Sequence, residues 1–108
     1  MGLPTEVFGD VIVIHTPEEL GEDQSIAVQE FLLTRDKDCL IVDLDGTETI
    51  DSLGLTVLLE TQSTLRERGG DLKITTSNHV NRKILEITRI DERLEVFDSV
   101  IDAVKSFV

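Results

Sequence analysis

The sequence predicts an α/β fold with a single-layer, mixed and mostly parallel sheet of four to five strands and about four helices. Short branched apolar runs alternate along the chain with longer segments of helical apolar spacing, in the order ββαβαβαβα. The run Cys39–Val42 is apolar without interruption, which is typical of a strand covered on both faces. The 108 residues fit one domain, expected to span 1–108.

The N-terminal part is expected to begin with two strands and a helix. Glu6–Phe8 forms a short strand, and Gly9-Asp10 turns it into Val11–Ile14, a β-branched run with high strand propensity. A helix over about 19–34 follows, with Pro17 suited to its start. The apolar face of this helix is expected to consist of Leu20, Ile26, Ala27, Phe31 and Leu32.

After Cys39–Val42, helices and strands alternate to the end of the chain. Their bounds follow from capping residues, from glycine just past a helix end, and from apolar periodicity. The expected elements are a helix from Ser52 to Gly69-Gly70, a strand at Leu72–Thr75, a helix from its cap Asn78 to about Thr88, a strand at Leu94–Phe97, and a last helix capped by Asp98 or Ser99.

The charge is strongly negative and unevenly distributed. The formal net charge is −12, from 22 acidic residues and 10 Lys plus Arg. Residues 1–51 hold 13 acids and two bases, whereas 52–108 hold nine acids and eight bases. Such a chain is repelled by nucleic acid and by anionic membranes, so neither is expected as a partner. The acidic half instead predicts attraction to a basic patch on a protein.

The remaining reactive side chains indicate no cofactor or metal. Cys39 is the only cysteine, so no internal disulfide can form, and it is expected to be buried and inert. His15 is expected in a loop and His79 in the first turn of the third helix. No apolar run approaches the roughly 20 residues that span a bilayer, so we expect a cytoplasmic domain without membrane insertion.

The loop after Cys39–Val42 contains the first of two candidate motifs. Ile41-Val42-Asp43-Leu44-Asp45-Gly46-Thr47 resembles the first motif of haloacid-dehalogenase-type phosphatases. The resemblance implies a magnesium-dependent phosphatase in which Asp43 is the nucleophile and Asp45 the acid/base. However, the motif follows a complete βα segment, and no acidic pair ends a later strand. This enzyme is therefore the least favoured interpretation.

The second motif lies where the loop becomes a helix. Ser52 is well suited to cap that helix, and Asp51 places negative charge beside the helix N-terminus. Gly54 is discordant, because glycine early in a helix costs about 0.5–1 kcal/mol relative to alanine. Either close helix packing or close approach of another molecule explains it. From spacing alone, ordinary capping remains an open interpretation of Ser52.

The segment Asp51-Ser52-Leu53-Gly54-Leu55 resembles the D-S-x-G-L signature of the STAS domain family, which includes bacterial anti-sigma-factor antagonists. The resemblance extends over about 39–107. It includes the apolar strand Leu40–Leu44 with its acidic end, the segment Gly69–Ile74, and the two C-terminal segments Val80–Ile87 and Leu94–Val104. It implies the STAS-like version of the predicted fold.

The resemblance implies a regulatory binding domain that catalyses nothing itself. An anti-sigma factor with a histidine-kinase-like ATPase fold and serine kinase activity would bind it and phosphorylate Ser52. Phosphorylation would end binding, and a serine phosphatase would reset the domain. A phosphate would add about −1.5 to −2 charges, which free amides at the helix N-terminus could hold. A weak homodimer is left open.

The partner-binding residues expected around Ser52 share its loop or the acidic segment before it. The family often has G-x-L-D after its first main strand, whereas Glu18-Glu19-Leu20-Gly21 stands there, so Glu22 or Asp23 would supply the acid. The alternative is a STAS accessory subunit of a membrane transporter, or a scaffold, in which Ser52 is only a cap. The expected contact residues are Asp51, Gly54, Leu55, Asp45, Glu48, Glu22 and Asp23.

Overall fold

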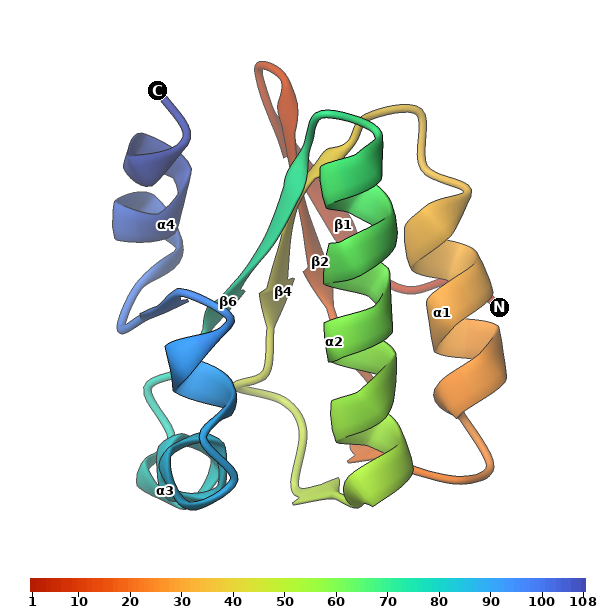
Figure 1. Cartoon of the computed structure of the whole chain (residues 1–108), viewed down its shortest axis with the longest axis vertical. Coiled ribbons are helices and arrows are strands. Elements are labelled where there is room, and N and C mark those ends of the chain that lie inside the picture. Colours follow the sequence, from red (N-terminus) through yellow and green to blue (C-terminus); the bar gives the residue numbers. More distant parts are fainter.

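The computed structural model describes residues 1–108 and is centred on a five-stranded mixed sheet (Figure 1). The strand order is β1-β2-β4-β6-β7, in which only β1 runs antiparallel to its neighbour. The predicted fold class is therefore confirmed. The strands are β1 (Thr5–Phe8), β2 (Val11–His15), β4 (Cys39–Asp43), β6 (Asp71–Thr75) and β7 (Val96–Phe97).

Four α-helices cover the sheet or close its lower end (Figure 1). Two parallel helices, α1 and α2, pack on one face, and α4 packs on the other. The helix α3 is seen end-on at the foot of the molecule, and the short 3-10 helix η1 follows it. Their bounds are α1 Ser25–Leu33, α2 Ser52–Glu67, α3 His79–Ile87, η1 Ile90–Glu92 and α4 Val100–Ser106.

The alternation of side chains along the strands divides the apolar interior between the two faces. Ile12 and Val42 belong to the cluster of 18 buried residues under α1 and α2. Val13 and Ile41 belong to a cluster of only four, which α4 covers with Ala103. Because successive side chains of a strand point to opposite faces, a shift of one residue in register would exchange the two sets. The main core therefore fixes the register.

The helix predicted over 19–34 is wrong at its start. Glu19–Leu20 forms a two-residue strand, β3, which pairs in parallel with β5 (Thr49–Ile50) in a separate small sheet. The chain then turns, because the amides of Gln24 and Ser25 both donate to the Gly21 carbonyl. The first helix begins only at Ser25.

The late start of α1 changes which of its side chains are buried. Its buried side is formed by Ser25, Val28, Phe31 and Leu32. Ile26, which the sequence placed on the apolar face, is 71% exposed.

The predicted strand at Leu94–Phe97 is also shorter in the structure than expected, since only Val96–Phe97 pairs with β6. The caps Asn78 and Ser99 are confirmed by their hydrogen bonds to helix amides.

Candidate functional site at the start of α2

The start of α2 is capped by Asp51, not by Ser52 as the sequence suggested. The amides of Leu53 and Gly54 donate to Asp51 Oδ1 over 2.9 and 3.0 Å. Asp51 has the extended backbone of a capping residue, whereas Ser52 is the first residue of the helix. The Ser52 hydroxyl makes no hydrogen bond to the protein, and its residue is exposed. The serine hydroxyl is therefore accessible to solvent.

The second oxygen of Asp51 joins the helix start to the segment before α1. The amide of Glu22 donates to Asp51 Oδ2 over 3.0 Å. The donated bonds of Gly54, Glu22 and Leu53 hold the pKa of Asp51 below its ordinary value of 3.8. The carboxylate is thus charged at any physiological pH. One exposed side chain ties α2 to a segment 29 residues earlier in the chain.

Gly21 leaves the space that the Asp51 carboxylate occupies. A Cβ on Gly21 would lie 2.6 Å from Asp51 Oδ2, which is closer than real contacts allow. A side chain at position 21 would therefore require the Asp51 carboxylate, the flexible end of that side chain, to shift. The side chains of Glu22 and Asp23 are exposed just beyond it, where the sequence predicted the substitute acid.

Gly54 is explained by the close approach of the chain itself. A Cβ on Gly54 would lie only 2.1 Å from the backbone oxygen of Leu20. The amide of Asp51 donates to the same Leu20 oxygen over 3.2 Å. Of the two explanations left open by the sequence, close packing is thus observed. Without a side chain at Gly54, the first turn of α2 lies directly against β3.

An open cleft lies beside the cap, between the small β3–β5 sheet and the segment leading to α1. Its volume is about 300 Å³. Four of its lining residues are acidic, and no basic residue lines it. Negative charge from several carboxylates therefore faces one small volume. The lining residues are Glu19, Leu20, Gly21, Glu22, Asp23, Gln24, Thr49, Ile50 and Asp51.

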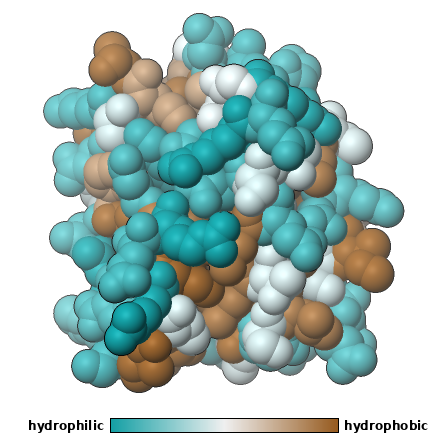
Figure 2. Space-filling model, in the orientation of Figure 1, coloured by the Kyte–Doolittle hydropathy of each residue, from teal (hydrophilic) through white to brown (hydrophobic).

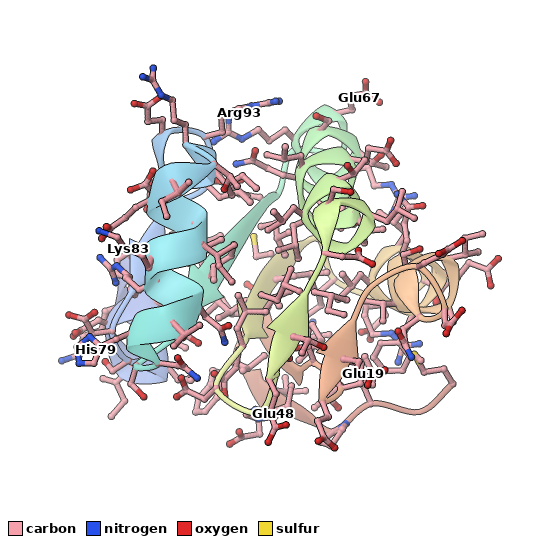
Figure 3. All side chains as sticks on the ribbon, turned by 90° about the horizontal axis from the view of Figure 1, so that it is seen from below. Glu19, Glu48, Glu67, His79, Lys83 and Arg93 are labelled. Atoms are coloured by element: carbon pink, nitrogen blue, oxygen red, sulfur yellow. The ribbon has the colours of Figure 1, made fainter.

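The structure brings only some of the predicted partner-binding residues to this surface. Glu22, Asp23 and Asp51 line the cleft. Glu48 is exposed at the same end of the molecule, where Figure 3 shows it below β5 together with Glu19. Leu55, in contrast, is 8% exposed and belongs to the main apolar core, and Gly54 is buried.

Asp45 points to a different neighbour from the one expected. The amide of Ser77 donates to Asp45 Oδ1 over 2.6 Å, and the Ser77 hydroxyl lies 3.2 Å from Oδ2. Asp43 is also engaged, because its carboxylate lies 2.8 Å from the His15 ring and accepts the Asp45 amide. The two aspartates of the phosphatase-like motif thus hold separate structural contacts. No group of three or more His, Cys, Asp or Glu is arranged as metal ligands.

Two exposed apolar side chains at this end of the molecule, Leu53 and Ile26, were not among the contact residues predicted from the sequence. Leu53, next to Ser52, is 45% exposed, and Ile26 lies in the first turn of α1. Both α1 and α2 begin at the lower end in Figure 1. In the same orientation, hydrophilic side chains cover most of the surface and hydrophobic ones group in its lower centre (Figure 2). The sequence places Leu53 directly after Ser52, but only the structure shows that its side chain is exposed.

A mixed sheet with two parallel helices on one face, the longer of which begins at an exposed serine, is the fold on which the family assignment rests. The profile of the STAS domain matches residues 3–103 of the chain. The chain therefore belongs to the STAS domain family, as its motifs indicated. None of its helices has the length and apolar character required to cross a bilayer.

The most similar proteins include two from Thermotoga. A candidate anti-sigma factor antagonist homologue from Thermotoga neapolitana is 21% identical over 106 residues, covering 94% of each chain. The crystal structure of a candidate anti-sigma factor antagonist from Thermotoga maritima superposes with a TM-score of 0.88 at 19% identity, covering 96% of this chain and 92% of that one.

Two further solved structures come from different settings. The phosphorylated form of a cell fate determinant from Bacillus has a TM-score of 0.72 at 15% identity, covering 99% of this chain and 100% of that one. A sulfate transporter family protein from Wolinella succinogenes has a TM-score of 0.80 at 19% identity, covering 94% and 87%. At such identities the likeness concerns the fold.

Proposed function

We propose that this STAS domain is an anti-sigma-factor antagonist. In this proposal, the end of the molecule around Ser52 binds an anti-sigma factor that is also a serine kinase. Binding frees the sigma factor, so the domain regulates transcription in the cytoplasm by exchange of partners and catalyses no reaction. Phosphorylation of Ser52 ends binding, and a serine phosphatase restores it. The observation that carries the proposal is the Ser52 hydroxyl, exposed and without a hydrogen bond beside the acidic cleft.

The capping of α2 supports the part of the proposal that concerns release. The sequence predicted free amides at this helix start for a phosphate, but the amides of Leu53 and Gly54 already donate to Asp51. A phosphate on Ser52 would therefore meet the carboxylate of the adjacent residue and the acidic cleft, rather than free donors. The phosphate would then stand beside Leu53 in the contact with the partner, where it would have to lose its hydration. The domain itself would keep its fold, because the Ser52 hydroxyl makes no hydrogen bond that phosphorylation would break.

The charge around the site indicates the chemistry of the partner. Glu19, Glu22 and Asp23 line the cleft, and Glu48 lies at the same end. A partner surface with lysine or arginine around an apolar pocket for Leu53 fits this arrangement, since apolar side chains anchor interfaces and charges steer them. Association is expected to slow as salt is added, because exposed charges are screened beyond about 8 Å at physiological ionic strength.

In a second candidate function, the domain has the same fold but is not regulated by phosphorylation of Ser52. The likeness to a sulfate transporter family protein favours a STAS accessory subunit of a membrane transporter, or a scaffold, as the alternative. Ser52 would then have no chemical role. The phosphatase interpretation is less well supported, because Asp43 and Asp45 are held by His15 and Ser77.

Phosphorylation by the cognate kinase tests the proposal. The full chain is incubated with its anti-sigma factor and ATP, and the intact mass is measured for wild type, Ser52→Ala and Ser63→Ala. Ser63 is a matched control, because it is an exposed serine of the same helix. One phosphate is expected on wild type and on Ser63→Ala, and none on Ser52→Ala. Equal labelling of wild type and Ser52→Ala, or no labelling at all, would overturn the switch.

A further inference from the structure

A row of polar side chains crosses four strands at the end of the sheet nearest the site. His15, Asp43 and Thr75 are paired in register as the last residues of β2, β4 and β6. Glu6 of the edge strand β1 completes the row, because its carboxylate reaches the His15 ring. His15 is therefore a strand residue, not the loop residue that the sequence suggested. The His15 ring lies between two carboxylates, that of Glu6 on one neighbouring strand and that of Asp43 on the other.

Both nitrogens of the His15 ring are occupied by carboxylate oxygens. Nε2 lies 2.7 Å from Glu6 Oε1, and Nδ1 lies 2.8 Å from Asp43 Oδ2. An ionised carboxylate can only accept hydrogen bonds, so both contacts are made only when the ring carries a proton on each nitrogen. Neither carboxylate has another ionic partner, since no lysine or arginine forms an ion pair with Glu6 or Asp43.

We propose that Glu6, His15 and Asp43 form a pH-sensitive clasp that holds the edge strand β1 on the sheet and loosens it when the imidazole loses its proton. A neutral ring has one N–H and can serve only one of the two carboxylates. The unprotonated nitrogen then faces an oxygen that repels it. This clasp stands independently of the function proposed above.

The two contacts differ in how readily they can be lost. The Asp43 side chain is 12% exposed, and it also accepts the Asp45 amide and the Thr75 hydroxyl. The Glu6 side chain is 54% exposed and has no other hydrogen bond, so it can turn into water at little cost. The neutral ring therefore keeps Asp43 and releases Glu6. The loop that leads from Asp43 to the site stays in place.

Strand β1 has fewer other contacts that hold it on the sheet than the remaining strands have, so the Glu6–His15 contact matters more for it. Its four residues are all exposed, and it pairs only with β2. Beyond that ladder, the amide of His15 donates to the Pro4 carbonyl. The elements that bury the other strands, α1, α2 and α4, leave the β1 side chains in solvent. Loss of the Glu6 contact therefore acts on the least buried strand of the sheet.

The direction of the pH effect follows from the ionisation of His15. Partial burial lowers the pKa of His15, but the hydrogen bonds and charges of Glu6 and Asp43 outweigh it, so the pKa lies above its ordinary value of 6.5. A raised pKa in the folded state means that the stabilisation is complete below about 6.5. It is lost as the pH rises through the raised pKa. The clasp is closed in acid and open in base.

Hydrogen exchange of the full chain tests the clasp. Protection factors of the Thr5–Phe8 amides, which correct for the intrinsic pH dependence of exchange, are measured by NMR at pH 6 and pH 9 relative to those of β6. In wild type we expect β1 protection to fall by about five-fold at pH 9, the size of one half-exposed ion pair. The variant Glu6→Gln should show no fall, because an amide can donate to or accept from either form of the ring.

A matched variant separates the clasp from a general effect of charge. Glu86→Gln removes the same charge from an exposed position on α3 and should behave as wild type. The ring signals of His79, which has no side-chain hydrogen bond, serve as an internal reference. Protection of β1 that is the same at both pH values in wild type would overturn the clasp. A fall that persists in Glu6→Gln, or that disappears in Glu86→Gln, would also overturn it.

Discussion

The helices α2 and α3 begin with the same local chemistry and differ in what surrounds it. Asp51 and Asn78 each cap a helix by accepting hydrogen bonds from the amides two and three residues later. The next residue is exposed in both, Ser52 in one and His79 in the other. The position after that holds an exposed apolar side chain, Leu53 or Val80. The cap motif alone therefore does not distinguish the two ends.

The difference lies in the third helical position and in the charge. In α2 this position is Gly54, which lets the Leu20 backbone approach the helix. In α3 it is Asn81, fully buried, whose amide nitrogen donates to the carbonyls of Leu44 and Thr47. Only α2 has a charged cap and an acidic cleft beside it. The comparison teaches that tertiary contacts, and not the cap, make one helix start a candidate site.

The largest effect is expected from Gly54→Ala. The added Cβ would collide with the Leu20 oxygen, and backbone atoms cannot move aside as a flexible side chain can. Overpacking of this kind is expected to lower the free energy of unfolding by about 3 kcal/mol. Urea unfolding of the purified variant measures it. A loss under about 0.5 kcal/mol, within the range of a neutral surface substitution, would mean that Leu20 does not pack against α2 as described.

Asn81→Ala makes the equivalent change at α3 by removing a side chain instead of adding one. The buried Thr47 carbonyl would lose its donor, and the Leu44 carbonyl would keep only the Thr47 amide. We expect a loss of about 2 kcal/mol, since a buried acceptor without a partner costs about 1–3 kcal/mol. The same urea titration measures it. Asn81→Asp, which has the same shape without the amide donors, should be no more stable than the alanine variant.

The capping side chains themselves should contribute less to the stability of the fold, and the two caps should not contribute equally. Asn78→Ala is expected to cost about 1 kcal/mol, the usual value for loss of a capping side chain. Asp51→Ala should cost more, because it also removes the acceptor of the Glu22 amide. Thermal unfolding of both variants at neutral pH compares them directly. Equal shifts in Tm would show that the link from Asp51 to Glu22 contributes nothing.

The smallest effect expected is a dependence on acid pH that only the α2 cap shows. The lowered pKa of Asp51 means that its stabilisation is present above the ordinary value of 3.8 and is lost as the pH falls through the lowered value. The difference in unfolding free energy between wild type and Asp51→Asn should therefore shrink between pH 6 and pH 2. Asn78→Ala should give a difference that does not change with pH over that range.

The sequence predicted the fold well because long elements carry strong periodic signals. The sheet and its main covering helix are determined by three such signals, in Val11–Ile14, in Cys39–Val42 and in the leucines of α2. Most strands and helices lie near their expected places. The small strands β3 and β5 were missed. Two residues have no periodicity, and Glu19–Leu20 becomes a strand only because Thr49–Ile50 lies beside it. A helical pattern from 19 onward was therefore a reasonable but wrong prediction.

The site could be predicted by position but not by role. Asp and Ser are both good capping residues, so only the extended backbone of Asp51 decides which of them caps α2. Likewise, Leu55 is part of the family motif, but its spacing from the other leucines of α2 also fits the buried face of the helix. The structure places Leu55 on that buried face. The approach of His15 to Glu6 and Asp43 depends on strand register across the sheet, which no local pattern encodes.

The affinity of the domain for its anti-sigma factor tests the proposed switch most directly. Calorimetric titrations would compare the domain without phosphate, the domain phosphorylated on Ser52, and unphosphorylated His79→Ala as a control at the start of α3. The phosphorylated domain is expected to bind at least about 100-fold more weakly, because a phosphate beside Leu53 would have to lose its hydration within the apolar part of the contact. His79→Ala should bind as wild type. Equal affinities with and without the phosphate would contradict a switch at Ser52.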